Sequence, residues 1–276
     1  MFHRTARVIE HVQLAERTFR VRLKCPEIAA AIRPGQFVML RLPNTTDPLL
    51  GRPFALYDTV LDGGKSVAFD VVYLVVGKMT SRLPEVSAGE ALQVWGPLGK
   101  PFLDVGTPDR VALVAGGIGQ TPFLAYAREL LGTRGFGGDA PRARTKRVSL
   151  YYGVRNAGLV ACADDFRAAG VEVHLASDDG SIGTKGFVTQ LLESHGKVGP
   201  LVGCGPEPML HALARLAARW EVPCQVSLET PMACGVGICF SCVAKVKTPD
   251  GDDYKRVCVD GPCFDAAKLP WPSSSE

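Results

Sequence analysis

The stretch Cys234-Gly-Val-Gly-Ile-Cys239-Phe-Ser-Cys242, with Cys258 further along the chain, organises the interpretation of this sequence. Four thiolates in the order C-x4-C-x2-C…C can enclose one [2Fe–2S] cluster, because the short spacings present three sulfurs from one tight loop and a returning strand brings the fourth. The sequence therefore predicts a metal centre with Cys234, Cys239, Cys242 and Cys258 as ligands.

The residues between these cysteines agree with a cluster loop. Gly235 and Gly237 lack a Cβ, so backbone N–H groups can turn toward the cluster sulfurs and stabilise their negative charge. We expect the apolar neighbours to shield that charge from water. These neighbours are Ala233, Val236, Ile238 and Phe240.

Two alternatives stay open at this point. A structural zinc site usually places its cysteines in two separated pairs, whereas this chain has three thiols close together and one distant thiol. Cys263, just after the Gly261-Pro262 turn, is a rival to Cys258 as the fourth ligand. The spacing favours an iron–sulfur cluster over zinc.

Length and composition limit the classes of function. The 276 residues are enough for two sizeable domains, or for two domains and a small appendage. A net charge of +3 with 21% charged residues leaves no basic stripe or acidic run, which argues against nucleic acid or a membrane surface as a partner. The longest apolar run, Val71 to Val76, is far shorter than the roughly 20 residues of a membrane helix. Nine cysteines behind a start that lacks an apolar signal core predict a cytoplasmic protein.

Residues 5 to about 100 are expected to form antiparallel strands. In the segment Phe19 to Lys24, apolar and basic residues alternate, which places Phe19, Val21 and Leu23 on one buried face. Further strands, separated by turns, are expected at Arg7–Leu14, Gly35–Leu42, Phe54–Thr59, Val67–Val76 and Ala91–Trp95. Short strands with turns between them predict a closed antiparallel β-barrel.

After Pro101 the pattern changes to alternating strands and helices. Arg110–Ala115 is a continuous apolar run typical of a strand buried on both faces, and Pro122 is well placed to begin a helix through Leu131. Further strands are expected at 148–152, 171–176, 201–204 and 223–227, and helices at 164–169, 187–193 and 207–220. The alternation predicts a doubly wound parallel sheet, with Gly132–Lys146 as an exposed loop.

Glycine turns follow two of these strands. Gly116-Gly117-Ile118-Gly119, before Thr121, would let bare backbone approach a pyrophosphate at the start of a helix. Cys204-Gly205-Pro206 would line the same carboxyl edge of the sheet. The first turn lacks the G-x-G-x-x-G spacing, so a tight structural turn explains its glycines about as well. The two turns together predict a nucleotide cleft.

Two motifs of the barrel could meet phosphates. In Arg52-Pro53-Phe54-Ala55 the planar guanidinium could bind a diphosphate, while the strand backbone runs along a flat ring. Gly77-Lys78-Met79-Thr80-Ser81 could offer N–H groups and a hydroxyl to the same phosphates. A solvated surface arginine and a plain loop are the respective alternatives.

Together these motifs resemble one family. The Arg-Pro barrel, the Gly-Gly-Ile-Gly-x-Thr-Pro and Cys-Gly-Pro turns and the terminal cysteines look like a ferredoxin-NADP⁺-reductase-type flavoprotein with a cluster domain appended. The segments 229–237 and 257–262 closely resemble the electron-transfer subunit of NAD-linked dihydroorotate dehydrogenase. The resemblance implies an FAD-binding β-barrel at 1–103, an NAD-binding α/β domain at 104–226 and a small [2Fe–2S] domain at 227–276.

The resemblance also implies cofactor-binding residues. FAD would be held by Arg52, Pro53, Phe54, Ala55, Val72, Tyr73, Leu74, Met79 and Thr80. NAD(H) would be held by Gly116, Gly117, Gly119, Thr121, Cys204, Gly205 and Pro206. The family usually has Ser or Thr at the position of Ala55 and Gly at that of Met79. The chain thus lacks a hydroxyl available to the flavin ring, and Met79 adds bulk where close backbone approach is expected.

Nucleotide choice is read from the segment after the third strand of the sheet. Asp178 and Asp179 would repel a 2′-phosphate, and no arginine is expected nearby to receive one, which favours NAD over NADP, although a solvated turn explains these residues as well. Cys204 is expected to pack near the nicotinamide without acting as a nucleophile, because no basic residue stands beside it to lower its pKa.

The function implied by the resemblance is electron transfer in pyrimidine biosynthesis. An FMN-containing catalytic subunit, joined in a hetero-oligomer such as a heterotetramer, would oxidise dihydroorotate, and electrons would pass through the cluster and FAD to NAD⁺. Alone, the chain is expected to reduce dyes with NADH but not to oxidise dihydroorotate. The alternatives are a subunit of a bifurcating NAD(P)H-ferredoxin oxidoreductase, an oxygenase reductase, and a non-enzymatic interaction module stapled by zinc.

Overall fold

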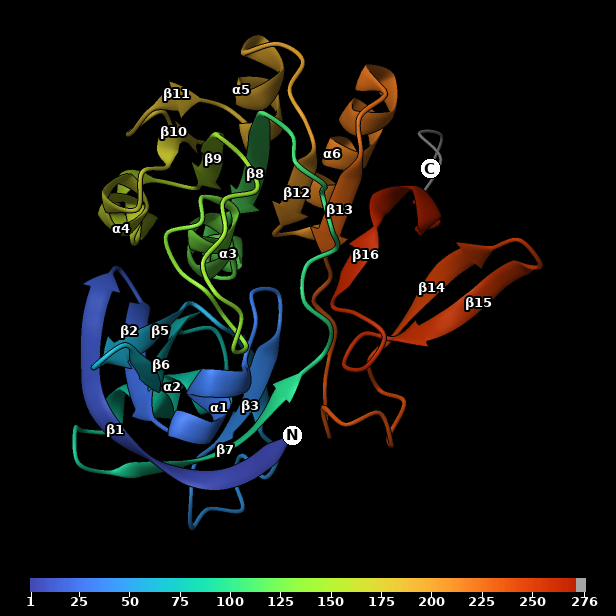
Figure 1. The fold of residues 1–276 in the computed structure, drawn as a ribbon. Helices are drawn as coiled ribbons and strands as arrows, with labels where there is room; N and C mark the ends of the chain where they lie inside the picture. Colours follow the sequence, from blue (N-terminus) through green and yellow to red (C-terminus); the bar gives the residue numbers. More distant parts are fainter. Residues whose placement is uncertain (272–276) are drawn as a thin grey trace.

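The computed structural model describes residues 1–271, and its N-terminal part is a curved antiparallel sheet (Figure 1). This sheet has seven strands in the order β4-β3-β7-β1-β2-β6-β5. The strands are β1 Phe2–Ala15, β2 Thr18–Lys24, β3 Phe37–Arg41, β4 Arg52–Ala55, β5 Asp58–Asp62, β6 Lys65–Leu74 and β7 Ala91–Leu98. Three short helices accompany them: α1 Pro26–Ala31, α2 Lys78–Arg82 and the 3₁₀ turn η1 Leu83–Glu85. The antiparallel barrel expected from the sequence is therefore present as a half-barrel.

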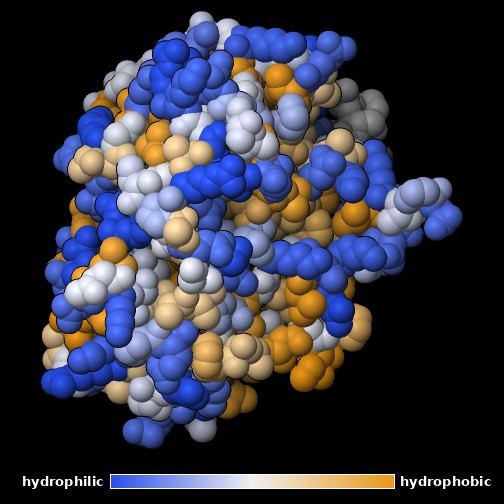
Figure 2. Space-filling model, viewed as in Figure 1, coloured by the Kyte–Doolittle hydropathy of each residue, from blue (hydrophilic) through white to orange (hydrophobic). Residues whose placement is uncertain are grey.

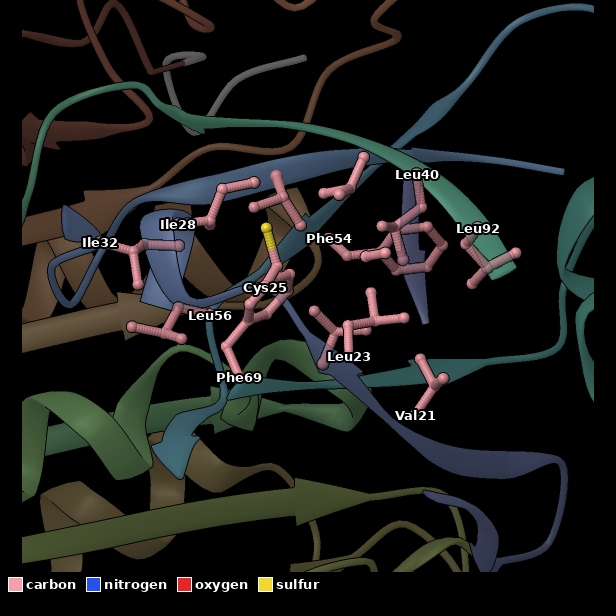
Figure 3. Close-up of a cluster of buried hydrophobic side chains, with 14 of the residues drawn as sticks. Val21, Leu23, Cys25, Ile28, Ile32, Leu40, Phe54, Leu56, Phe69 and Leu92 are labelled. Atoms are coloured by element: carbon pink, nitrogen blue, oxygen red, sulfur yellow. The ribbon is translucent and has the colours of Figure 1, made fainter. Parts of the chain in front are cut away.

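The interior of the half-barrel is filled by apolar side chains that point toward one another (Figure 3). Val21 and Leu23 of β2 are fully buried, as their alternation with arginines predicts, and Ile28 and Ile32 close the core from the side of α1. Burial of each such side chain contributes about 1.5–3 kcal/mol. This packing fixes the position of β4, which carries the Arg-Pro motif.

The second part is the predicted doubly wound sheet, in the order β11-β10-β9-β8-β12-β13-β16. Its parallel strands are β8 Arg110–Gly116, β9 Arg147–Val154, β10 Glu172–Ser177, β11 Thr184–Lys185, β12 Leu201–Cys204 and β13 Cys224–Ser227. The helices between them are η2 Gly117–Gln120, α3 Phe123–Leu130, η3 Ala157–Leu159, α4 Ala163–Ala168, α5 Val188–Ser194 and α6 Glu207–Trp220.

Strand β8 shows why this sheet is covered on both faces. Val111 and Leu113 pack in the same apolar core as α3 and α4, whereas Ala112 and Val114 pack with α5 and α6. A strand buried on both sides needs an uninterrupted apolar run, which this segment has. The helices therefore lie on both faces and leave the carboxyl edge of the sheet available for ligands.

The third part is the C-terminal segment with its cysteines. It contains the hairpin β14 Val243–Thr248 and β15 Gly251–Arg256, then β16 Cys263–Asp265 and the turn η4 Ala266–Lys268. Strand β16 pairs antiparallel with β13, so it extends the α/β sheet. Val257 and Phe264 share one apolar core with Phe37 and Met39 of the barrel and Val226 of the α/β sheet.

Two expectations about the elements are wrong. The expected strand Phe54–Thr59 is two strands, because the chain leaves β3 there and joins β6: Leu56 N donates to Gln36 O, and Tyr57 N donates to Asp70 O. The loop 132–146 is not simply exposed, since Phe136 is buried in the core of the half-barrel. Across residues 1–271, every helix is too short or too polar to cross a membrane.

Candidate functional site

The strand order of the α/β sheet reverses between β8 and β12, the place where such sheets bind nucleotides. The two predicted glycine turns meet there. An ideal Cβ on Gly119 would lie 2.2 Å from the Cys204 carbonyl oxygen, and one on Gly116 would lie 2.7 Å from Pro206 Cδ. Close packing of the two turns therefore accounts for these glycines, while Gly117, at φ +54°, borders open space.

A cavity of about 830 Å³ lies between the half-barrel, the α/β sheet and residues 227–233. Its volume falls in the range of roughly 300–1,000 Å³ typical of cofactor sites. Every predicted flavin-binding residue lines it, and so do Gly119, Thr121 and Cys204. The other predicted nucleotide residues lie outside its lining: these are Gly116, Gly117, Gly205 and Pro206.

Two charged residues line this cavity, Arg52 and Glu229. Arg52 Nη1 donates to the carbonyl oxygens of Leu50 at 3.1 Å and Gly51 at 3.0 Å, and Arg52 makes no ion pair with a carboxylate in residues 1–271. Thr230 Oγ1 is also buried without a partner in that range. An uncompensated guanidinium suits a diphosphate, and the largely apolar walls suit a ring system. The residues present therefore fit FAD.

Tyr73 stands in the cavity wall with its ring fixed. The ring stacks on Phe19 at a centroid distance of 5.7 Å, and its hydroxyl lies 2.8 Å from His11 Nε2. His11 Nδ1 lies 2.7 Å from the Val86 carbonyl oxygen, which can only accept, so Nδ1 carries the proton and the Tyr73 hydroxyl donates to Nε2. Burial raises the pKa of Tyr73. An isolated histidine gave no sequence signal for this role.

Two expectations for the phosphate loop need correction. Met79 is buried in the half-barrel core, so its bulk is absorbed by packing and does not stand over the loop. Thr80 Oγ1 accepts from Val76 N at 3.0 Å and Gly77 N at 2.9 Å, and it donates to Gly77 O at 3.0 Å. The hydroxyl thus holds the loop itself and is not free for a phosphate.

The outer end of the carboxyl edge carries an arginine that the sequence reading missed. Asp179 N donates to the carbonyl oxygen of Arg155 at 3.3 Å, so Arg155 follows β9 beside the acidic turn that follows β10. The expectation that no arginine lies near the acidic residues is therefore wrong, because it considered only neighbours in sequence. Hydrogen bonds from Ser181 lower the pKa of Asp179, which keeps the carboxylate charged. Phe187, just past β11, has a side chain that is 67% exposed.

The four predicted cluster ligands lie on the loop 234–242 and on the segment that returns to it. Val257 N donates to the Cys242 carbonyl oxygen at 2.8 Å, and Cys242 and Cys258 are buried in the same apolar core. In residues 1–271 no set of three or more His, Cys, Asp or Glu side chains surrounds a single metal position. A [2Fe–2S] cluster takes two thiolates at each iron, whereas a structural zinc ion takes four ligands that converge on one position.

The backbone of the cluster loop has the expected turned conformation. Gly235 and Gly237 have φ values of +73° and +81°, in the left-handed region that favours glycine. The Val236 N–H points at the Cys234 sulfur, at a distance of 3.4 Å. One backbone donor of the loop therefore faces the sulfur of a predicted ligand.

The outer side of this loop is exposed, so the expected shielding is wrong for two residues. The exposed fractions of Ile238 and Phe240 are 78% and 61%, and Cys239 between them is also exposed. The hydroxyl of Ser241 lowers the pKa of Cys239, whereas burial raises that of Cys258. The loop thus has a buried side toward the protein and an apolar side toward solvent.

The remaining thiols lie away from the cluster loop. Cys263 is on β16 opposite Ser227, and burial raises its pKa well above the ordinary range. Burial likewise raises the pKa of Cys204 to about 12, which agrees with a packing residue. Cys258 thus packs in one apolar core with Cys242, whereas Cys263 packs in a core of the α/β sheet.

Comparison with known proteins identifies the family. Residues 5–102 match the oxidoreductase FAD-binding domain, and residues 229–270 match the iron-sulfur cluster binding domain of dihydroorotate dehydrogenase B. The electron transfer subunit of dihydroorotate dehydrogenase B (NAD(+)) from Desulforamulus reducens is 34% identical over 269 residues, which cover 96% of this chain and 97% of that protein. The chain belongs to this family of electron transfer subunits. The family member from Geobacillus kaustophilus is 37% identical over 260 residues, covering 93% of this chain and 94% of its own.

Solved structures agree with this family. An NADH-dependent reduced ferredoxin-NADP oxidoreductase superposes with a TM-score of 0.80 at 27% identity, covering 96% of this chain and 90% of that chain. Phthalate dioxygenase reductase shares the fold, with a TM-score of 0.63 at 20% identity and 95% coverage of both chains. The predicted fold class and the predicted cofactors FAD, [2Fe–2S] and NAD are thereby confirmed. The individual binding residues remain predictions.

Proposed function

We propose that this chain carries electrons between an FMN-containing dihydroorotate dehydrogenase subunit and NAD⁺ in the cytoplasm, as part of pyrimidine biosynthesis. The position of the cluster loop supports this most directly. Ala233 and Ser241 of the loop line the cavity, whereas Ile238, Cys239 and Phe240 face solvent. One loop thus connects the flavin cavity with the protein surface, as an electron outlet to a partner subunit must.

The residues of the cavity have distinct tasks in this function. FAD, when bound, exchanges electron pairs with a nicotinamide and single electrons with an iron–sulfur cluster. Arg52 would hold its diphosphate, and Tyr73, fixed by His11, would form the wall beside the ring. At the far end of the carboxyl edge, Arg155 and the exposed ring of Phe187 would bind the adenosine half of NAD.

The partner would cover the apolar outer side of the cluster loop. Figure 2 shows hydrophobic atoms gathered below the β14–β15 hairpin, where the cluster loop lies in Figure 1. Ile238 and Phe240 of the cluster loop are both large, apolar and exposed, and exposed apolar side chains that lie together mark interaction sites. Burial of the face would also remove Cys239 from water.

The test is reconstitution with a catalytic subunit. The purified chain should contain FAD and iron and reduce a dye with NADH, and only the mixture should reduce NAD⁺ with dihydroorotate. Ile238→Asp should weaken transfer in the mixture. Leu61→Asp, which charges an exposed leucine of β5 elsewhere on the half-barrel, should not. A chain that never couples to dihydroorotate oxidation, or that co-purifies with a partner carrying a second FAD, would contradict the proposal.

A further inference from the structure

Trp95 of β7 contacts both the flavin side of the barrel and the cluster loop. Its indole Nε1 donates a hydrogen bond of 3.0 Å to the carbonyl oxygen of Cys234, a predicted cluster ligand. At the other end of the indole, an ideal Cβ on Gly51 would lie only 2.5 Å from Trp95 Cη2. Gly51 directly precedes Arg52, so one side chain spans from the start of the flavin strand to the first cysteine.

Strands β4, β3 and β7, which are neighbours in the sheet, connect Trp95 with the Arg-Pro motif. Met39 of β3 pairs with Pro53 of β4 on one side and with Trp95 of β7 on the other. Two strand spacings separate Pro53 from Trp95, roughly 10 Å. Met39 also meets the cluster loop directly, because an ideal Cβ on Gly235 would lie 2.7 Å from its Cγ. The flavin strand and the cluster loop are thus joined through a rigid sheet.

We propose that Trp95 is a positioning residue that fixes the cluster loop relative to the flavin strand β4. The proposal rests on the proposed function only in that FAD and the cluster exchange electrons. Loss of the indole N–H would leave the Cys234 carbonyl without its donor and loosen the loop, while the cavity residues around Arg52 and Tyr73 keep their contacts. Flavin reduction by NADH should then persist, and electron transfer to the cluster should slow.

The matched pair of variants is Trp95→Phe and Trp271→Phe. Trp271 Nε1 donates a comparable 2.8 Å hydrogen bond to the Ala266 carbonyl oxygen, which is not part of the cluster loop. One hydrogen bond of this kind changes a local opening equilibrium about fivefold. We therefore expect amide hydrogen exchange in 233–242 to be about fivefold faster in Trp95→Phe and unchanged in Trp271→Phe. In anaerobic stopped-flow with NADH, cluster bleaching should slow severalfold in Trp95→Phe, at an unchanged rate of flavin reduction.

A second variant covers the case in which Trp95→Phe does not fold. In Gly51→Ala the new methyl group pushes against the indole, but the indole keeps its N–H. As in Trp95→Phe, amide hydrogen exchange in 233–242 should be faster and reduction of the cluster by NADH should be slower. Equal exchange and equal cluster reduction in Trp95→Phe and Trp271→Phe would overturn the proposal. Failure of the wild-type chain to reduce its own cluster with NADH would instead refute the proposed function, and the exchange comparison would then decide on Trp95 alone.

Discussion

The contact between the two glycine turns leads to a specific prediction for Gly119→Ala. The new Cβ would lie 2.2 Å from Cys204 O, 2.5 Å from Cys204 C and 2.8 Å from Gly205 N. All three are backbone atoms at the end of β12, so no flexible side chain can move aside. Either η2 or the end of β12 must shift, and both border the cavity at its nucleotide side.

The size of the effect follows from that overlap. The gap must open by at least 0.8 Å, from 2.2 Å to the 3.0 Å below which real Cβ contacts are essentially never found. Forcing an extra methyl into a packed site costs about 1–3 kcal/mol. If the same free energy is lost from NADH binding, the KM for NADH rises roughly 5- to 150-fold. The conformation of Gly119 adds no cost, since its φ is not in the left-handed region.

The assay is NADH-dependent dye reduction together with urea unfolding. Gly196→Ala is the control, because Gly196 has φ +83° and no atom within 4 Å of an ideal Cβ. It should lower stability by about 1–2 kcal/mol through its conformation alone and leave the KM unchanged. A KM for Gly119→Ala within twofold of the wild type, or the same KM change in both variants, would refute the reasoning.

Three further outcomes are expected. Cys258→Ser should lose the cluster iron while Cys263→Ser keeps it, as measured by iron per FAD, because Cys258 packs with Cys242 whereas Cys263 lies in a core of the α/β sheet. Arg52→Gln should weaken FAD binding roughly 10- to 100-fold, measured by the fluorescence of released flavin, since charged hydrogen bonds contribute about 1.5–3 kcal/mol. Burial raises the pKa of Glu129 from 4.5 to about 7, so the folded state binds the extra proton and wild-type stability should fall as the pH rises from 4.5 through 7. Glu129→Gln should remove this pH dependence. At pH 8 its free energy of unfolding in urea should exceed that of the wild type by ~1–2 kcal/mol, a value reduced because the side chain is partly exposed, and at pH 4.5 the two should be equal.

Local patterns predicted the elements best. Strand β12 at Leu201–Cys204 and helix α6 at Glu207–Trp220 have the predicted bounds, because an apolar run and a helical period are set within the segment itself. The hairpin of β14 and β15 was not predicted, although it turns at Pro249-Asp250, a dipeptide typical of turns. The break after Ala55 was out of reach, because it depends on which distant strands Leu56 and Tyr57 join.

For the site, too, contacts between distant segments could not be predicted from local sequence patterns. Its cysteines and the Arg-Pro motif are contiguous in sequence, so chemistry alone pointed to them. Arg155 and Asp179 come together only because β9 and β10 are neighbours in the sheet. Trp95 and Cys234 are 139 residues apart, and no pattern in either segment indicates their hydrogen bond. Contacts between the parts of the site depend on sheet register, which a single sequence does not reveal.

The cluster segment is packed against both the half-barrel and the α/β sheet, which joins the three parts of the protein. Its apolar residues share a core with the half-barrel and the α/β sheet, and β16 is itself a strand of that sheet. Beyond the contact of Cys234 with Trp95, Lys100 N donates to Gly261 O at 2.6 Å, so the segment after Cys258 is also attached to the barrel. A separately folded cluster domain would need a core of its own and could swing away from the flavin. Here both ends of the ligand set are attached to the rest of the protein, and the face of Ile238 and Phe240 remains exposed for a partner.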